Sequence, residues 1–368
     1  MTSSSKRAQR NAAAASSDPG EAAASCALPA GKIPADLLRN LLASLATLDP
    51  SVCVGAAVGE DAAVIDLGGD DLLVVKTDPI TFAAAQPGRY LLAVNGNDLA
   101  TMGAEPRWLL VTALMAEGSA AQDVLAIFED LRQASIESGV ALVGGHTEIT
   151  LGLNRTILAG SLLGTVPRNR LLRTSGARPA DAILLAGGIA IEGTAVLAAE
   201  HSGALASAGV PAGVVTRAAG WLSHPGISVL PAARILRDIE GIHAMHDPTE
   251  GGLATALHEM AEAAGVGLRI DRAAVEVLPE CSAICRALGI DPLGLLASGA
   301  LLATLEPRAA TAALSRLLAA GIPAARIGET VALSEGRVMI DNGRERLLGV
   351  FARDELARYL ETPAGKGL

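Results

Sequence analysis

Two adjacent carboxylates stand out in the stretch AVGEDAAVID, where Glu60 and Asp61 separate a glycine from an apolar run. Only 18% of the residues are charged, so acids at the start of a predicted strand are informative. Carboxylates that converge with others from elsewhere in a chain can bind a hard cation such as Mg²⁺. The alternative is structural, because Gly and Asp are common in turns that precede strands. The decapeptide alone leaves both interpretations open.

Further polar residues interrupt apolar segments downstream. Asp78 lies at the end of the predicted strand in LVVKTDPI, where a turn residue is an equally ordinary explanation. In LAVNGNDLATMG, Asn95 and Asp98 are three residues apart and share one face of a predicted helix. A buried carboxylate needs a partner or a metal, so we predict a functional role for Asp98 unless this face is solvated.

A pair of glycines precedes polar residues in ALVGGHTEIT. Gly144 and Gly145 follow an apolar strand and allow the backbone to approach a ligand closely. They are equally consistent with a bend at the strand end. His146 and Thr147 are either site residues or structural ones, and the sequence does not decide between these interpretations.

The stretch HDPTEGG has a strong structural interpretation. Asp247 fits an N-cap, Pro248 the first helical position and Glu250 the third, which resembles a capping box. This interpretation does not explain Gly251 and Gly252, since glycine inside a helix costs roughly 1 kcal/mol. Backbone amides at these glycines could instead face a phosphate or a metal-bound ligand.

The elements that must position these residues alternate between strands and helices. Expected strands cover residues 62–67, 72–78, 141–145, 156–166, 181–190, 265–271, 299–306, 324–331 and 337–341. Expected helices cover residues 31–45, 87–103, 121–139, 192–203, 247–265 and 308–321. Residues 1–29 lack apolar periodicity and are predicted to be a disordered tail. We therefore expect two α/β domains, residues 30–167 and 168–350, followed by a C-terminal helix and tail over 351–368.

Composition narrows the function classes of this 368-residue chain. A net charge of −10 argues against a nonspecific nucleic-acid binder, which needs a basic surface. No apolar stretch reaches 18 residues, and the N-terminus lacks the apolar core of a signal peptide, so we predict a cytoplasmic protein without membrane spans. Four cysteines are too few for a disulfide framework, and we expect buried or idle thiols at Cys26, Cys53, Cys281 and Cys285.

Five of these stretches occur in an order that resembles a known superfamily. VGEDAAVI, KTD, LAVNGNDLATMGAEP, LVGGHTE and HDPTEGGLATALHEMAEAAGVG follow one another as in the PurM-like, AIR synthase-related ATP-binding superfamily. The similarity runs from about residue 31 to 349. It is greatest to the hydrogenase-maturation dehydratase (HypE) group, and the first half also resembles thiamine-monophosphate kinase. The resemblance implies a two-domain PurM-like fold of the α/β class with two layers, and a homodimer that binds ATP between domains and across the subunit interface.

The resemblance also implies roles for individual residues. Asp61, Asp78 and Asp98 correspond to acids that hold Mg²⁺ around the ATP phosphates. Glu60 stands where Asp is frequent in the superfamily. Asp98 and Asp247 are the expected catalytic residues. The other expected ATP contacts are Asn95, Gly144, Gly145, His146, Thr147, Gly251 and Gly252; relatives often have Asp at the position of His146.

Two departures from the resemblance affect the reaction. The HypE group carries its substrate on a terminal cysteine, whereas this chain ends ETPAGKGL and its last cysteine is Cys285. Ser298 stands where several relatives have an acid.

The main hypothesis is a Mg²⁺- and ATP-dependent enzyme that phosphorylates an amide or carbonyl oxygen of a diffusible small molecule. The alternatives are a small-molecule kinase and a nucleotide-binding regulator without turnover.

Overall fold

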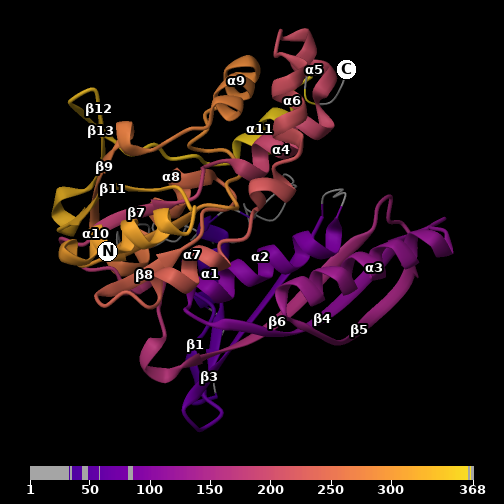
Figure 1. Cartoon of the computed structure of the whole chain (residues 1–368), viewed down its shortest axis with the longest axis horizontal. Coiled ribbons are helices and arrows are strands. Elements are labelled where there is room, and N and C mark those ends of the chain that lie inside the picture. The colour runs from indigo at the N-terminus through magenta and orange to yellow at the C-terminus, as the bar shows by residue number, and fades with distance from the viewer. Residues whose placement is uncertain are drawn as a thin grey trace, which may run out of the picture.

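Two β-sheets, each with its own helices, build the protein (Figure 1). The computed structural model describes residues 33, 35–43, 49–57, 59–81, 86–363 and 365. The predicted tail over residues 1–29, with Cys26, lies outside these residues. Within them, none of the helices combines the length and the apolar character that crossing a membrane requires.

The first sheet has six strands in the order β1-β2-β3-β6-β4-β5. Its strands are β1 (Val52–Val54), β2 (Ala63–Ile65), β3 (Asp71–Ile80), β4 (Glu105–Ala116), β5 (Ala141–Thr150) and β6 (Ile157–Pro167). All neighbours are antiparallel except β4 and β5, which are parallel. The chain segment before β1 contains α1 (Ala35–Ala43).

Helices α2 (Pro87–Thr101) and α3 (Ala121–Ser138) cover one face of this sheet (Figure 1). Pro87 begins α2, a position where its missing N–H costs no hydrogen bond. Gly139 ends α3 in a left-handed conformation with φ 72°, as the sequence predicts. Buried leucines of α2, together with Leu131 of α3, pack on the sheet and form the first core.

The second sheet has seven strands in the order β13-β12-β9-β11-β7-β10-β8. Its strands are β7 (Ala182–Ala186), β8 (Ile242–His246), β9 (Gly267–Asp271), β10 (Leu301–Leu305), β11 (Ala324–Val331), β12 (Arg337–Asp341) and β13 (Arg344–Leu347). Helix α8 (Gly252–Ala264) packs on one face, and α7 (Leu230–Leu236) and α10 (Pro307–Ala319) pack on the other. The inner strand β7 is buried along its whole length because helices cover both faces of the sheet.

A separate helical group extends the second domain. It consists of α4 (Ile191–Glu200), α5 (Ser202–Ser207), α6 (Ala212–Ala219), α9 (Pro279–Leu288) and α11 (Glu355–Leu360). Cys281 and Cys285 are buried in α9 and belong to this apolar core, in agreement with the expected buried thiols.

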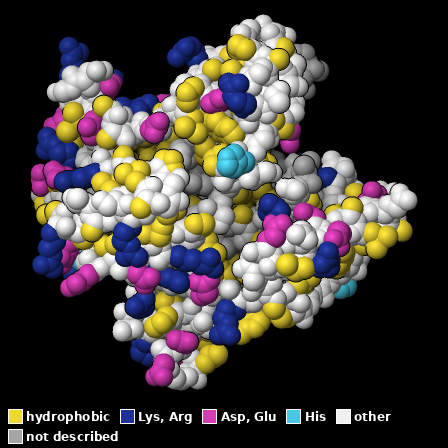
Figure 2. All heavy atoms as spheres, in the orientation of Figure 1, with side chains coloured by type: hydrophobic (Ala, Val, Ile, Leu, Met, Phe, Trp, Pro, Cys, Tyr) yellow, Lys and Arg dark blue, Asp and Glu magenta, His cyan; other side chains and the backbone are white. Residues whose placement is uncertain are grey.

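Several elements were not expected from the sequence, among them β8, which carries His246, and three further departures concern segments discussed above. Strand β4 was not anticipated, since a continuous apolar run does not distinguish a strand from a buried helix. Strand β5 continues through Gly144 and Gly145, where we expected a strand end. Helix α8 begins at Gly252, five residues after the expected cap at Asp247. On the face shown in Figure 2, Lys and Arg side chains are interspersed with Asp and Glu side chains.

Candidate functional site

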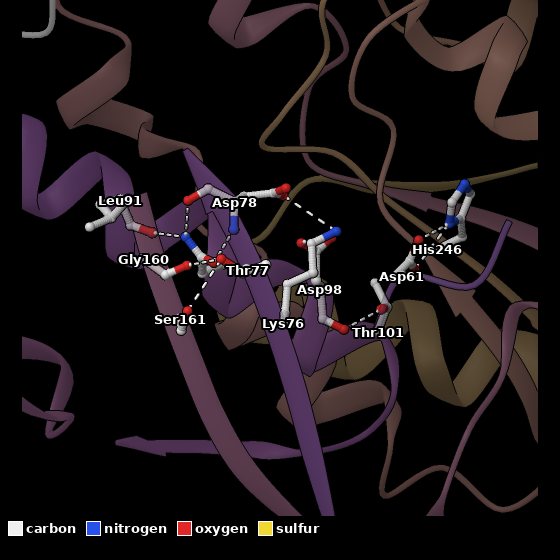
Figure 3. A network of polar contacts seen from close by, with 11 residues as sticks. Asp61, Lys76, Thr77, Asp78, Leu91, Asp98, Thr101, Gly160, Ser161 and His246 are labelled. Atoms are coloured by element: carbon white, nitrogen blue, oxygen red, sulfur yellow. Dashed lines mark hydrogen bonds and ion pairs between the residues drawn. The ribbon is translucent and has the colours of Figure 1, made fainter. Parts of the chain in front are cut away.

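An ammonium group lies between two carboxylates where β3 meets α2 (Figure 3). Lys76 and Asp78 are two residues apart on β3 and therefore point to the same side of the sheet. The Nζ atom of Lys76 lies 3.0 Å from Oδ2 of Asp98 and 3.4 Å from Oδ2 of Asp78. The two acids predicted from their sequence context are thus brought together through a lysine.

Burial and charge shift the pKa values in this group. Burial of Asp98, with the nearby charge of Asp247, raises its pKa well above the ordinary value, although Lys76 opposes the shift. Burial alone would lower the pKa of Lys76, but the carboxylates of Asp98 and Asp78 outweigh burial and raise it. The group holds two carboxyl groups and one ammonium group, and a further cation beside them would favour the charged form of Asp98.

Asn95 positions Asp78 through backbone hydrogen bonds. Its Oδ1 accepts a hydrogen bond of 2.8 Å from the backbone N–H of Asp78. Its Nδ2 donates to the carbonyl oxygens of Leu91 at 3.0 Å and Asp78 at 3.3 Å (Figure 3). Asn95 is fully buried, so its amide connects α2 to β3 beside the carboxylates.

A second polar group joins the two domains around His246, the last residue of β8. Its Nδ1 lies 2.9 Å from Oδ1 of Asp61, and its Nε2 lies 3.2 Å from a carboxylate oxygen of Glu259 on α8. Gly59 lets the Asp61 loop pass close to α8, since its φ is 83° and an added Cβ would lie 3.2 Å from the backbone oxygen of Glu259. The pair Glu60–Asp61 therefore belongs to a loop at the domain junction.

Asp247 follows His246 directly and is buried. One of its carboxylate oxygens, Oδ1, has no hydrogen-bond partner among the described residues. Burial and the charge of Asp61 raise the pKa of Asp247 to about 7, while His246 opposes the shift. Asp247 is not the helix cap that the capping-box pattern indicated, so its position at the junction requires another explanation. Glu60, on the Asp61 loop, accepts a 2.8 Å hydrogen bond from the hydroxyl of Ser175.

Asn97 also connects the domains. Its Nδ2 donates to the carbonyl of Ile227 at 2.8 Å, and its Oδ1 accepts from the N–H of Val229 at 2.9 Å. The side chain is 1% exposed. These two hydrogen bonds fix the end of α2, and with it Asp98, against the second domain.

The residues Gly144 to Thr147 lie apart from this junction. They belong to the middle of β5, an edge strand, and not to a turn. The β4–β5 register shifts next to Gly144, and Gly145 has φ 150° with the position of a Cβ only 1.8 Å from the oxygen of Val111. Close backbone packing at this irregularity therefore accounts for Gly145. His146 is exposed and lies 3.2 Å from Glu148.

Gly251 and Gly252 lie at the start of α8 and not inside it, with φ values of 80° and 67°. The N–H of Gly251 donates to Oδ2 of Asp354 at 2.7 Å. The N–H of Gly252 donates to the carbonyl of Thr249 at 3.1 Å. Both amides are satisfied within the chain, so the structure offers no free amide here for a phosphate.

A further buried acid lies beside this turn. Glu192 on α4 accepts a hydrogen bond from the hydroxyl of Tyr90 on α2, so this contact also crosses the domain junction. Burial and the charges of Glu250 and Asp354 raise the pKa of Glu192 to about 8, while a hydrogen bond with Ser298 opposes the shift. Ser298 therefore contacts a buried acid of α4.

Sequence reasoning did not single out Lys76, His246 or Glu259. Lys76 was recognisable, because it precedes Asp78 by two residues and must share its face of the strand. His246 stands next to Asp247, but its partner Asp61 is 185 residues away, and no spacing in the sequence indicates that contact.

The chain belongs to the AIR synthase related protein family: the N-terminal domain of that family matches residues 59–166 and the C-terminal domain matches residues 178–341. Within the family, the carbamoyl dehydratase HypE of Cupriavidus necator is 33% identical over 284 residues, 74% of this chain and 77% of that protein. A crystal structure of the hydrogenase maturation protein HypE in complex with ATP is 27% identical, covers 81% of this chain and 90% of that chain, and has a TM-score of 0.66. Thiamine monophosphate kinase from Aquifex aeolicus is 17% identical, with a TM-score of 0.62 over 85% of this chain and 97% of its own, and shares the fold.

Proposed function

We propose that this protein binds ATP with Mg²⁺ at the domain junction and uses it to activate an amide or carbonyl oxygen of a small-molecule acceptor. The similarity to carbamoyl dehydratase HypE and to its ATP complex supports this reaction class. The observation that carries the proposal is the group formed by Lys76, Asp78 and Asp98 next to Asp61 and Asp247.

The donor set fits Mg²⁺. Asp61, Asp78 and Asp98 offer carboxylate oxygens, the ligands that hard cations prefer. Asp98 is 5% exposed and its carboxylate is destabilised by burial and by neighbouring acids, so a divalent cation would stabilise its charged form. Mg²⁺ bound there supplies charge neutralisation for a transferring phosphoryl group.

The chain's own residues then have separate roles. Lys76 offers an ammonium group to the phosphates, and Asn95 keeps Asp78 in place through the hydrogen bonds described above. Asp98 and Asp247 interact electrostatically across the junction, and we propose both as the catalytic residues. Their burial places the reaction in a low dielectric, where oriented charges act more strongly than in water.

The proposed reaction has two steps. The acceptor oxygen attacks the γ-phosphorus of ATP, the bond to the β-phosphate oxygen breaks, and ADP leaves. The carbon–oxygen bond then breaks and phosphate leaves, while either the amide nitrogen loses its protons and forms a multiple bond to the carbon, or a nucleophilic nitrogen of the same acceptor bonds to that carbon, loses a proton and closes a ring. Cys281 and Cys285 are buried in α9, which supports an acceptor that is not attached to either thiol.

Replacement Asp98→Asn tests the proposal. We expect ATP affinity in the presence of Mg²⁺ to fall by roughly tenfold or more, because the charge that holds the cation is removed. Calorimetry measures the affinity, and circular dichroism checks the fold. Asp71→Asn is the control for removal of a carboxylate, since Asp71 is an exposed acid at the start of β3, seven residues before Asp78. Equal ATP affinity in folded Asp98→Asn protein would remove Asp98 from the site.

Turnover needs a separate measurement. Magnesium-dependent ATP consumption, followed with and without a metabolite extract, should increase when the acceptor is present. ATP binding without consumption under any of these conditions would instead indicate a nucleotide-binding regulator.

We also propose that the protein is a homodimer through β5. This edge strand carries exposed apolar side chains, with Val143 55% and Ile149 54% exposed. An unpaired apolar edge is a template for pairing with another chain. The strand register places Gly145 of β5 opposite Val111 of β4, Val111 opposite Gly160 of β6, and Gly160 opposite Asp78 of β3. Three strand spacings therefore separate Gly145 from Asp78, a distance of about 14 Å. Light scattering should report twice the mass of the chain, and a monomer that binds ATP would reject this arrangement.

A further inference from the structure

His246 is a buried imidazole with a carboxylate on each side. Asp61 faces Nδ1 and Glu259 faces Nε2. Carboxylates that accept the second ring N–H of metal-binding histidines fix the tautomer and orient the ring. Glu259 is suitably placed for this role, because a hydrogen bond from Nε2 leaves Nδ1 directed toward Asp61.

The distances at Nδ1 suit a shared ion as well as a shared proton. Nδ1 lies 2.9 and 3.1 Å from the two oxygens of Asp61. Two adjacent ligands of an octahedral ion at about 2.1 Å lie about 3.0 Å apart, so an ion could take the place of the Nδ1 proton without large movement. Donor atoms of Asp61, His246 and Asp247 all lie within 4.8 Å of one another.

Asp247 supplies the independent observation. A protonated His246 between Asp61 and Glu259 would account for those two acids alone. It does not account for Oδ1 of Asp247, which is unpartnered although the residue is only 3% exposed. Buried carboxylate oxygens are normally hydrogen-bonded or bound to a metal.

We propose that Asp61, His246 and Asp247 form a metal site that takes a divalent first-row transition ion, such as Mn²⁺, in preference to Mg²⁺. On binding, the metal replaces the proton on Nδ1, while the Nε2 proton remains hydrogen-bonded to Glu259. One imidazole nitrogen and two carboxylates form the ligand set. The site deepens the proposed function, because Asp61 is common to it and to the proposed Mg²⁺ ligands.

The nitrogen ligand determines the choice of ion. Imidazole suits transition ions, whereas Mg²⁺ prefers an all-oxygen shell and keeps several waters. Asp78 and Asp98 offer oxygen alone, so the junction would hold two chemically different positions.

Electron paramagnetic resonance of the full chain with Mn²⁺ and no nucleotide tests the proposal. We expect about one bound Mn²⁺ per chain and a ¹⁴N coupling from an imidazole ligand. A tenfold excess of Mg²⁺ should displace little of the bound Mn²⁺. Bound Mn²⁺ without ¹⁴N coupling, or no binding at millimolar Mn²⁺, would overturn the proposal.

His246→Gln should weaken Mn²⁺ binding roughly tenfold or more and abolish the ¹⁴N coupling. His243→Gln is the matched control: His243 also lies on β8 with its side chain 8% exposed, but its Nδ1 pairs with Asp181 at 2.8 Å, and its replacement should leave Mn²⁺ binding unchanged. Unchanged affinity in His246→Gln protein would refute the assignment. If His246→Gln does not fold, Glu259→Gln should lower Mn²⁺ affinity by about 10-fold through its effect on the ring, and an unchanged affinity would count against the site.

The same proteins separate this inference from the proposed function. Mg²⁺-dependent ATP binding should change less than threefold in His246→Gln protein if the oxygen ligands alone hold the nucleotide's ion. A nitrogen-ligated Mn²⁺ in a protein that does not bind ATP would reject the proposed function and leave the metal site standing. ATP binding without nitrogen-ligated Mn²⁺ would do the reverse.

Discussion

Replacement Glu192→Gln should change how the stability of the protein depends on pH. Glu192 is 3% exposed, and burial raises its pKa from 4.5 to about 8. Between these values the folded protein holds a proton that the unfolded chain has lost, so stability falls as pH rises. Each pH unit in this window lowers the free energy of unfolding by about 1.4 kcal/mol. From pH 5.5 to 7.5 the contribution of Glu192 therefore changes by about 3 kcal/mol.

Glutamine resembles the protonated acid and can still accept from Tyr90, so Glu192→Gln protein should lose this part of the slope. Urea unfolding at pH 5.5, 6.5 and 7.5 measures the difference between the two proteins at each pH, which removes the contributions of other acids. Glu200→Gln, an exposed acid in the same helix, is the control and should run parallel to the wild type. Parallel profiles for Glu192→Gln and wild type would show that Glu192 is ionised in the folded protein.

Three further substitutions test the backbone and the domain junction. Asn97→Ala removes two buried hydrogen bonds and should lower the free energy of unfolding by about 2–4 kcal/mol, measured by urea unfolding. Gly145→Ala would place a Cβ 1.8 Å from a backbone oxygen and should disrupt the β4–β5 pairing, seen as faster amide exchange in β5; Gly144→Ala, with open space around it, should not. Gly252→Ala, 2.4 Å from a backbone oxygen, should lower the thermal midpoint more than Gly265→Ala, which has a similar φ at the other end of α8 but no nearby atoms.

The sequence predicts most elements and part of the site. Periodicity identifies α2, α3 and α10, and polar interruptions of apolar segments identify Asp78 and Asp98, because a charge in an apolar segment must be paired. The capping pattern at Asp247 failed because two glycines with positive φ delay the start of α8. The paired glycines of β5 left a ligand contact and a bend equally open in the sequence, and in the structure they lie at an irregularity within a strand. Local patterns carry no information on such close approaches between distant backbone segments.

The contacts of α2 with the second domain also bear on how the protein unfolds. Asn97, Tyr90 and Asp98 all interact across the boundary, and Asp61 reaches His246 from a neighbouring loop. Separation of the two halves would expose apolar surface and leave buried charges without their counterparts, which is costly. The halves should therefore denature in one cooperative transition and not as independent folding units. Neither half expressed alone should fold as it does in the intact chain.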